Sequence, residues 1–139
     1  MNLKKIDAIY EQIVGGNVRD YDGSQNRKEF LDCLCHLNQR ISQISSSDIC
    51  FLEIGAFKGL WAIAFKLLCQ RNNKTPLYTT VTWLEHNPEN RSLLKVRDYF
   101  RGEKLSFKLI DGNSLDKSII REAAKETYHF VLIDGDHSY

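Results

Sequence analysis

Four short polar segments hold the side chains of this sequence that could do chemistry, and each follows a run of apolar residues. They are residues 53–59, 85–88, 111–114 and 134–139. Each begins with a carboxylate, and the first contains two glycines, which let a backbone turn lie against a ligand. A ring of carboxylates suits a cationic ligand that carries hydroxyl groups, because carboxylates attract cations and accept hydrogen bonds. A pyrophosphate suits it poorly, since Glu53 stands just before the glycine turn and would repel it.

The apolar runs ahead of these segments are predicted to be the strands of a parallel sheet. The predicted strands cover residues 49–52, 81–84, 105–110 and 129–133, and helical patterns separate them at residues 60–71, 88–100 and 115–125. Alternating strands and helices are typical of an α/β fold, whose ligands bind beyond the carboxyl ends of the strands. We therefore expect a Rossmann-like sheet with strand order 3-2-1-4. The nearly all-apolar first and fourth strands are expected to be covered on both faces.

Two amphipathic helices are expected ahead of the sheet. The first has apolar residues from Ile6 to Val14, and the second has Phe30, Ile41 and the apolar residues between them on one face. Further along the chain, Pro88 and Ser114 are start signals for the later helices. We divide one domain into N-terminal helices at residues 1–47 and an α/β core at residues 48–139.

The composition excludes several classes of protein. The chain has 139 residues, with 19 Lys plus Arg against 18 Asp plus Glu. Such a balance gives no basic field for nucleic acid, and no apolar run reaches the roughly 18 residues of a membrane-spanning helix. We expect a single-domain cytoplasmic protein with no nucleic-acid or membrane partner. The cysteines lack the spacing of a zinc site and are expected to be reduced thiols in the core; they are Cys33, Cys35, Cys50 and Cys69.

The order and spacing of the polar segments resemble those of the class I S-adenosylmethionine-dependent methyltransferases. The resemblance covers about residues 28–139. The motifs that carry it are Glu53-x-Gly55-x-x-x-Gly59, Glu85, Gly112-Asn113-Ser114 and Ile133-Asp134-Gly135-Asp136-His137-Ser138-Tyr139. The last motif resembles the branch with macrolide-sugar and rhamnose O-methyltransferases and cephalosporin-hydroxylase-like proteins. The resemblance implies an enzyme that methylates a hydroxyl of a small molecule or sugar.

The resemblance also implies how S-adenosylmethionine would be bound. Glu53 would lie near the amino group of the cofactor and Glu85 would bind its ribose hydroxyls. Asn113 stands where the family usually has an Asp beside the adenine. The residues expected around the cofactor are Glu53, Gly55, Ala56, Phe57, Gly59, Glu85, Gly112, Asn113, Ser114 and Asp134.

For catalysis, the resemblance points to the last motif. In metal-dependent members of the family its first acid binds Mg²⁺, which makes Asp134 the metal ligand here. Its second acid acts as general base, which gives that role to Asp136. His137 is a rival base, because the pKa of a free imidazole lies near neutral pH.

The sequence departs from the family in places that lead to further expectations. Phe57 occupies a loop position where many relatives carry a small residue, Trp61 is expected to line the cofactor cleft, and Trp83 is expected in the core. The family fold continues with three more strands and further metal ligands after the position that corresponds to Tyr139. We therefore expect the 139-residue chain to bind cofactor weakly, to have little metal-dependent activity, and to form homo-oligomers through its fourth strand.

Two other functions remain open from the sequence. An NAD-dependent oxidoreductase would need Gly-x-Gly-x-x-Gly, and Phe57 fills its middle glycine position. The other is a truncated binding or assembly module that keeps the cofactor half of the fold without catalysis.

Overall fold

A single parallel sheet forms the centre of the molecule. The computed structural model describes residues 3–14, 27–56, 58–100 and 106–133. The strands of the sheet are β1 (Asp48–Ile54), β2 (Thr75–Thr82), β3 (Ser106–Asp111) and β4 (Phe130–Ile133). They run parallel in the order β3-β2-β1-β4, which confirms the predicted α/β, Rossmann-like fold.

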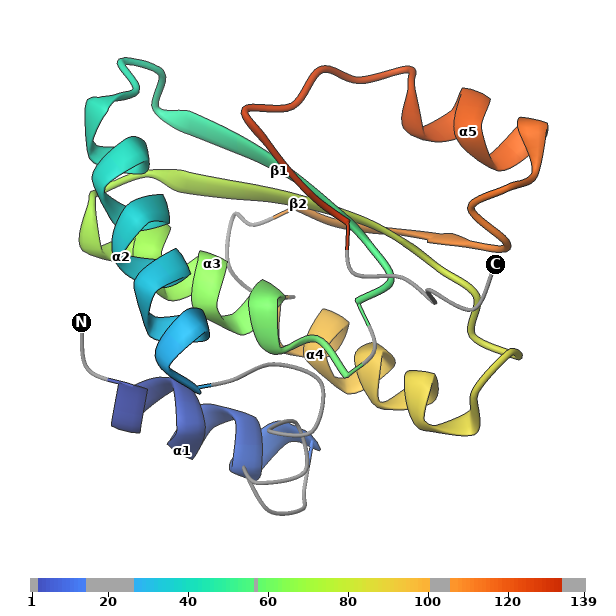
Figure 1. Ribbon diagram of the computed structural model, residues 1–139, viewed down its shortest axis with the longest axis horizontal. Coiled ribbons are helices and arrows are strands. Elements are labelled where there is room, and N and C mark those ends of the chain that lie inside the picture. The colour runs from blue at the N-terminus through green and yellow to red at the C-terminus, as the bar shows by residue number, and fades with distance from the viewer. Residues whose placement is uncertain (1–2, 15–26, 57, 101–105, 134–139) are drawn as a thin grey trace.

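The helices cover the two faces of the sheet unequally (Figure 1). They are α1 (Leu3–Val14), α2 (Arg27–Gln43), α3 (Leu60–Arg71), α4 (Ser92–Phe100) and α5 (Lys117–Ala123). The first four lie on one side and α5 lies on the other. Right-handed crossovers explain this arrangement, because the chain steps outward from β1 to β3 and then returns past β2 and β1 to reach β4.

The face that carries α1 to α4 holds the main core, which is rich in aromatic rings. Phe51 of β1 packs against Phe65 of α3 with ring centroids 4.9 Å apart, and Tyr78 of β2 packs against Phe107 at the same distance. Trp61 is 6% exposed and meets Phe30 of α2 edge to face. The expectation that Trp61 lines a cleft is therefore wrong, since it belongs to this core.

A buried lysine joins α3 to the end of α4 within the same layer. The Lys66 ammonium donates to the carbonyl oxygen of Tyr99 at 3.2 Å and lies 3.6 Å from the centroid of the Tyr99 ring. The last carbonyls of a helix lack helical partners and carry partial negative charge, so an ammonium is favourable there. Lys66 thereby fixes the end of α4 against α3.

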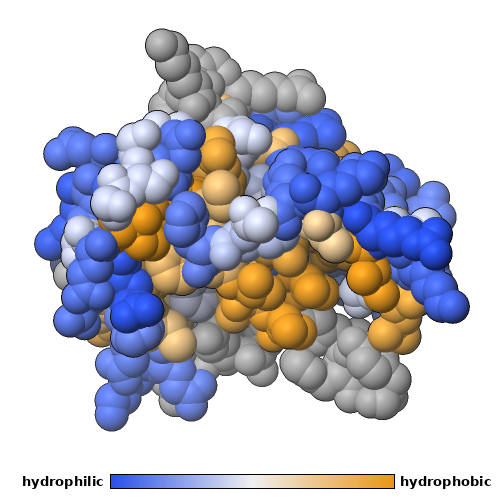
Figure 2. Space-filling model, turned by 90° about the horizontal axis from the view of Figure 1, so that it is seen from above, coloured by the Kyte–Doolittle hydropathy of each residue, from blue (hydrophilic) through white to orange (hydrophobic). Residues whose placement is uncertain are grey.

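The α5 face is thinly covered. A small cluster of Leu52, Val81 and Ile110 packs against α5, but no residue of α5 itself is fully buried. Figure 2 looks onto this side and shows an apolar area in its middle. Val131 and Ile133 of β4 are 56% and 68% exposed. The expectation that both faces of the fourth strand are covered is therefore wrong for the described residues.

Several local predictions also need correction. β2 begins at Thr75 and ends at Thr82, whereas the sequence pattern placed its core at residues 81–84. The cap position of α5 is Asp116 rather than Ser114, and the fourth predicted helix begins with a 3-10 turn at Pro88–Arg91. All four cysteines are free thiols, but only Cys69 is buried and two are exposed. None of the helices in the described ranges is long and apolar enough to cross a membrane.

Candidate functional site

The glycine turn after β1 uses its own amides to build itself. Gly55 and Gly59 have φ of 84° and 86°, a left-handed conformation that favours glycine. The Gly55 N–H donates to Val81 O at 2.9 Å and the Gly59 N–H donates to Ala56 O at 2.8 Å. The Ala56 N–H donates to the hydroxyl of Thr82 at 3.1 Å. These three amides are therefore engaged inside the protein and are not presented to a phosphate.

Gly59 is also required by helix packing. A Cβ atom at this position would lie 2.9 Å from Leu93 Cδ1 and 2.9 Å from Val96 Cγ2, both on α4. Contacts this close force a neighbour to move. The sequence predicted Gly59 as a cofactor residue. The structure adds a second reason for glycine here, because α4 packs too closely for a side chain.

Glu53 lies beneath the turn, on the face of the sheet that packs against α3. Its side chain is 1% exposed, and its Oε2 accepts a short hydrogen bond from the Tyr78 hydroxyl. Burial raises the pKa of Tyr78 well above its ordinary value, and the negative charge of Glu53 adds to the rise. Tyr78 therefore remains a neutral donor to a buried carboxylate.

The loop after β2 presents its side chains to solvent. Glu85 is exposed, and the Trp83 ring is 43% exposed and stacks on His86 with centroids 5.1 Å apart. The expectation that Trp83 is a core residue is thus wrong. Asp111, at the end of β3, supports this loop because its carboxylate accepts the Leu84 N–H at 3.0 Å. The Asn90 amide donates to the Trp83 carbonyl, also at 3.0 Å.

The loop after β3 is held by its own polar groups. The Asn113 side-chain oxygen accepts the Leu115 N–H at 2.9 Å. A Cβ atom on Gly112 would lie 2.6 Å from Ile119 Cδ1, so this glycine permits the close approach of α5. The Gly112 N–H donates to Thr82 O at 3.4 Å, which joins this loop to the end of β2. The first three polar segments are therefore brought together at one edge of the sheet.

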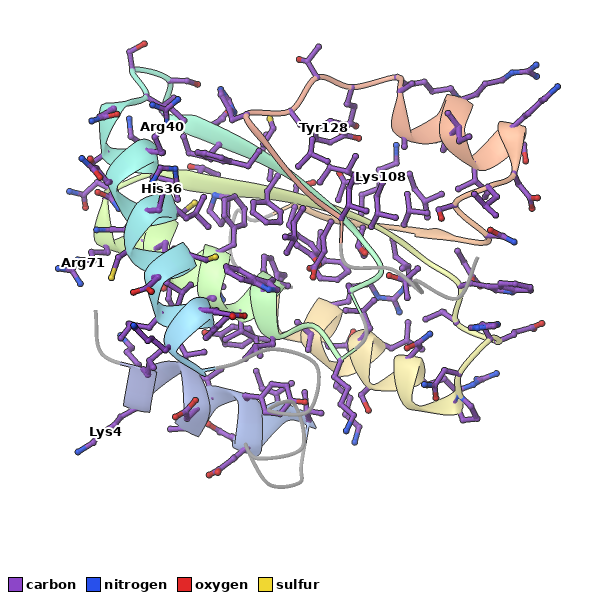
Figure 3. All side chains as sticks on the ribbon, in the orientation of Figure 1. Lys4, His36, Arg40, Arg71, Lys108 and Tyr128 are labelled. Carbon is purple, nitrogen blue, oxygen red and sulfur yellow. The ribbon has the colours of Figure 1, made fainter. Side chains whose placement is uncertain are left out.

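A cavity lies beside this edge, between the sheet and α5. Its volume is about 380 Å³, and Ser114, Glu126 and Tyr128 are the polar residues of a mainly apolar lining. Lys108 and Tyr128 both lie on this side of the sheet (Figure 3). The Tyr128 hydroxyl donates to Ala123 O at 2.7 Å, and Lys108 pairs with Glu122 at 3.3 Å. These polar groups therefore hold α5 to the sheet.

Several predicted site residues fall outside the described part of the chain. They are Phe57, Asp134, Asp136 and His137. The assignments of a metal ligand and a general base therefore stay predictions. Within the described ranges, no group of three or more His, Cys, Asp or Glu side chains could hold a metal ion.

The structure adds three residues that the sequence analysis missed. Tyr78, Thr80 and Thr82 are buried on one face of β2 and carry hydroxyls toward Glu53 and the turn. Their alternation in the segment Thr75–Thr82 is visible in the sequence. It is informative only once the strand is known to begin at Thr75.

Comparisons with known proteins assign no family to the chain. No family model matches it, and none of the curated proteins matches it either.

Proposed function

We propose that the protein is an S-adenosylmethionine-dependent methyltransferase that acts on a hydroxyl of a small molecule or sugar. The observation that carries the proposal is the glycine turn, whose Gly55, Ala56 and Gly59 amides bond within the protein, at the same edge of the sheet as the exposed carboxylate of Glu85. S-adenosylmethionine is cationic at its sulfonium and ammonium groups, carries two ribose hydroxyls and has no phosphate. A dinucleotide needs free turn amides for its pyrophosphate, so the same observation disfavours NAD.

The side chains at this edge fit the nucleoside half of the cofactor. Glu85 can accept hydrogen bonds from both ribose hydroxyls, since a carboxylate has two acceptor oxygens. The exposed Trp83 ring, stacked on His86, offers a flat surface for a purine beside it. Asn113 would contact the base through its amide group. Glu53 would act through its charge from beneath the turn, because its side chain is almost fully buried.

The remaining roles rest on the resemblance alone. Bound cofactor supplies a methyl group activated by the sulfonium. Transfer to oxygen needs removal of the acceptor proton and in-line alignment with the methyl group. Asp136 is proposed as the base, with His137 as the alternative, and Asp134 as the ligand of a magnesium ion.

The proposal is tested by calorimetric titration with S-adenosylhomocysteine and, separately, with NAD. We expect S-adenosylhomocysteine to bind and NAD not to bind. Glu85→Ala should weaken binding by about 10- to 100-fold, because charge-assisted hydrogen bonds to two hydroxyls are lost. Glu11→Ala removes an exposed carboxylate from α1 and serves as the matched control.

Three results would contradict the proposal or part of it. Tighter binding of NAD would favour the oxidoreductase, and equal affinity in wild type and Glu85→Ala would remove the ribose assignment. Binding of S-adenosylhomocysteine without methyl transfer to any hydroxyl acceptor would favour a non-catalytic binding module.

A further inference from the structure

Three hydroxyl side chains run along the buried face of β2 toward the glycine turn. Tyr78, Thr80 and Thr82 occupy alternate positions of the strand and therefore share one face. Their exposed fractions are 0%, 0% and 3%. At one end Tyr78 donates to Glu53, and at the other end Thr82 accepts the Ala56 N–H. The Thr80 and Thr82 hydroxyl oxygens lie 2.8 Å apart between them.

One arrangement of the donors points them all toward the carboxylate. The Tyr78 hydroxyl donates to Glu53, so its oxygen is left to accept a hydrogen bond from Thr80, two positions along the same face. With Thr80 donating to Tyr78, the bond between the two threonine hydroxyls, in which either oxygen can be the donor, runs from Thr82 to Thr80. The Thr82 oxygen in turn accepts the Ala56 N–H. Hydrogen bonds aligned in one direction strengthen one another.

Apolar side chains of similar shape would fit this part of the core. Val and Phe have the same propensity for strands as Thr and Tyr and bring no polar groups that need partners. Packing this strand with a buried carboxylate and three buried hydroxyls therefore costs more desolvation free energy than packing it with apolar side chains. What the hydroxyls provide, and apolar residues would not, is a hydrogen bond that holds the Ala56 amide.

We infer that Glu53, Tyr78, Thr80 and Thr82 form a hydroxyl chain that positions the glycine turn by holding the amide of Ala56. Glu53 is the fixed acceptor that orients the chain, and Thr82 is the group that touches the turn. These are positioning residues. The hydroxyl chain and its hold on the Ala56 amide need no ligand. Its effect on cofactor affinity rests on the proposed function.

Amide hydrogen exchange measured by NMR on the full chain tests the inference. Thr82→Val should speed exchange of the Ala56 amide by about fivefold relative to the Gly55 amide, whose acceptor is the backbone oxygen of Val81. Thr82→Ser keeps the hydroxyl and should restore the wild-type ratio. Thr79→Val removes a buried hydroxyl from the opposite face of the same strand and should leave the ratio unchanged.

Tyr78→Phe tests whether the effect travels along the chain. It removes only the oxygen atom and should speed Ala56 exchange about two- to threefold, although Tyr78 does not touch the turn. If the ratio of Ala56 to Gly55 exchange is unchanged in Tyr78→Phe, the residues beyond Thr82 do not help to hold the turn, and that part of the inference is wrong. An unchanged ratio in Thr82→Val would overturn the positioning of the turn, and this result can be read even if Tyr78→Phe fails to fold.

Affinity for S-adenosylhomocysteine provides the second readout. Thr82→Val should weaken binding about three- to tenfold, while Thr82→Ser and Thr79→Val stay within twofold of wild type. If all three variants bind S-adenosylhomocysteine with equal affinity, the hydroxyl chain has no effect on ligand binding. If the wild-type protein binds no S-adenosylhomocysteine, the proposed function fails while the exchange ratios still decide the inference.

Discussion

At the scale of single residues, burial keeps a thiol and a phenol protonated, those of Cys69 and Tyr78. Burial raises the pKa of the Cys69 thiol to about 12, and burial with the charge of Glu53 raises the pKa of Tyr78. In the unfolded chain these groups ionise near their ordinary pKa values of 9.0 and 10.0. Below pH 9 both states hold both protons, and above it the unfolded state releases protons that the folded state retains. Folding stability therefore falls as the pH rises.

We predict a loss of about 1.4 kcal/mol per pH unit for each group once the pH passes its unfolded pKa. Urea unfolding measured from pH 8 to pH 11 checks this. Cys69→Ala should reduce the part of the slope that begins near pH 9, and Tyr78→Phe the part that begins near pH 10; the raised pKa values of Cys50 and Tyr128 account for the remainder. Stability that is constant across this range would contradict the prediction.

Gly59 is a residue at which a single added methyl group should lower the stability of the fold. Gly59→Ala places a Cβ against Leu93 and Val96 at a φ that side chains disfavour, so we expect a loss of about 2–4 kcal/mol in the free energy of unfolding. Val96→Ala makes room for the new methyl group. The double variant should therefore lose less than the sum of the single losses, and strictly additive losses in urea unfolding would show that the contact with α4 is not the cause.

At the scale of elements, β4 is attached to β1 by an unusual bond at its start. His129 Nδ1 accepts the Cys50 N–H at 2.9 Å, and the His129 N–H donates to Cys50 O at 2.8 Å. His129→Ala should cost about 1 kcal/mol and speed amide exchange in β4 more than in β2. His129→Asn keeps an acceptor near the same place and should recover part of the loss. Equal acceleration in both strands would contradict a local role.

The bounds of α3 were easier to predict than those of β2, for a physical reason. Leu60–Arg71 matches its predicted range because a glycine precedes it and apolar residues fill it. β2 was placed too late because it begins with Thr75 and Pro76, which are typical of a loop, whereas in the structure these residues pair with β1. Pairing with a neighbouring strand is a long-range property that local composition does not reveal.

Part of the candidate site was predictable from the sequence and part was not. Parallel strands alone bring the first three polar segments to one edge, so Glu85 and the glycine turn lie where the pattern predicted. The burial of Glu53 was not predictable, because it depends on the register that sets Glu53 beside Thr80 and brings Tyr78 to its carboxylate. The burial of Trp61 and the exposure of Trp83 have a similar cause, since α2 covers Trp61 and none of the described helices covers Trp83.

At the scale of the whole molecule, the open side of β4 is the surface most suited to self-association. Val131 and Ile133 are exposed next to each other on a strand that pairs, among the described residues, only with β1. We expect sedimentation velocity to show concentration-dependent oligomers. Val131→Lys with Ile133→Lys should give a monomer, because charges on an edge strand oppose pairing. Ile120→Lys, on α5, is the matched control, and a wild-type monomer would contradict the expectation.

The docking of α1 has a consequence for the order in which the chain folds. α1 buries Ile6, Tyr10 and Val14 against α3 and α4, and α4 ends only at Phe100. During synthesis at about 5–20 residues per second, α1 therefore waits roughly 4–17 s before its last partner has been made. Throughout that interval its apolar stripe is exposed on the nascent chain, where a chaperone can bind it. α1 therefore reaches its final place only after α3 and α4 have been made.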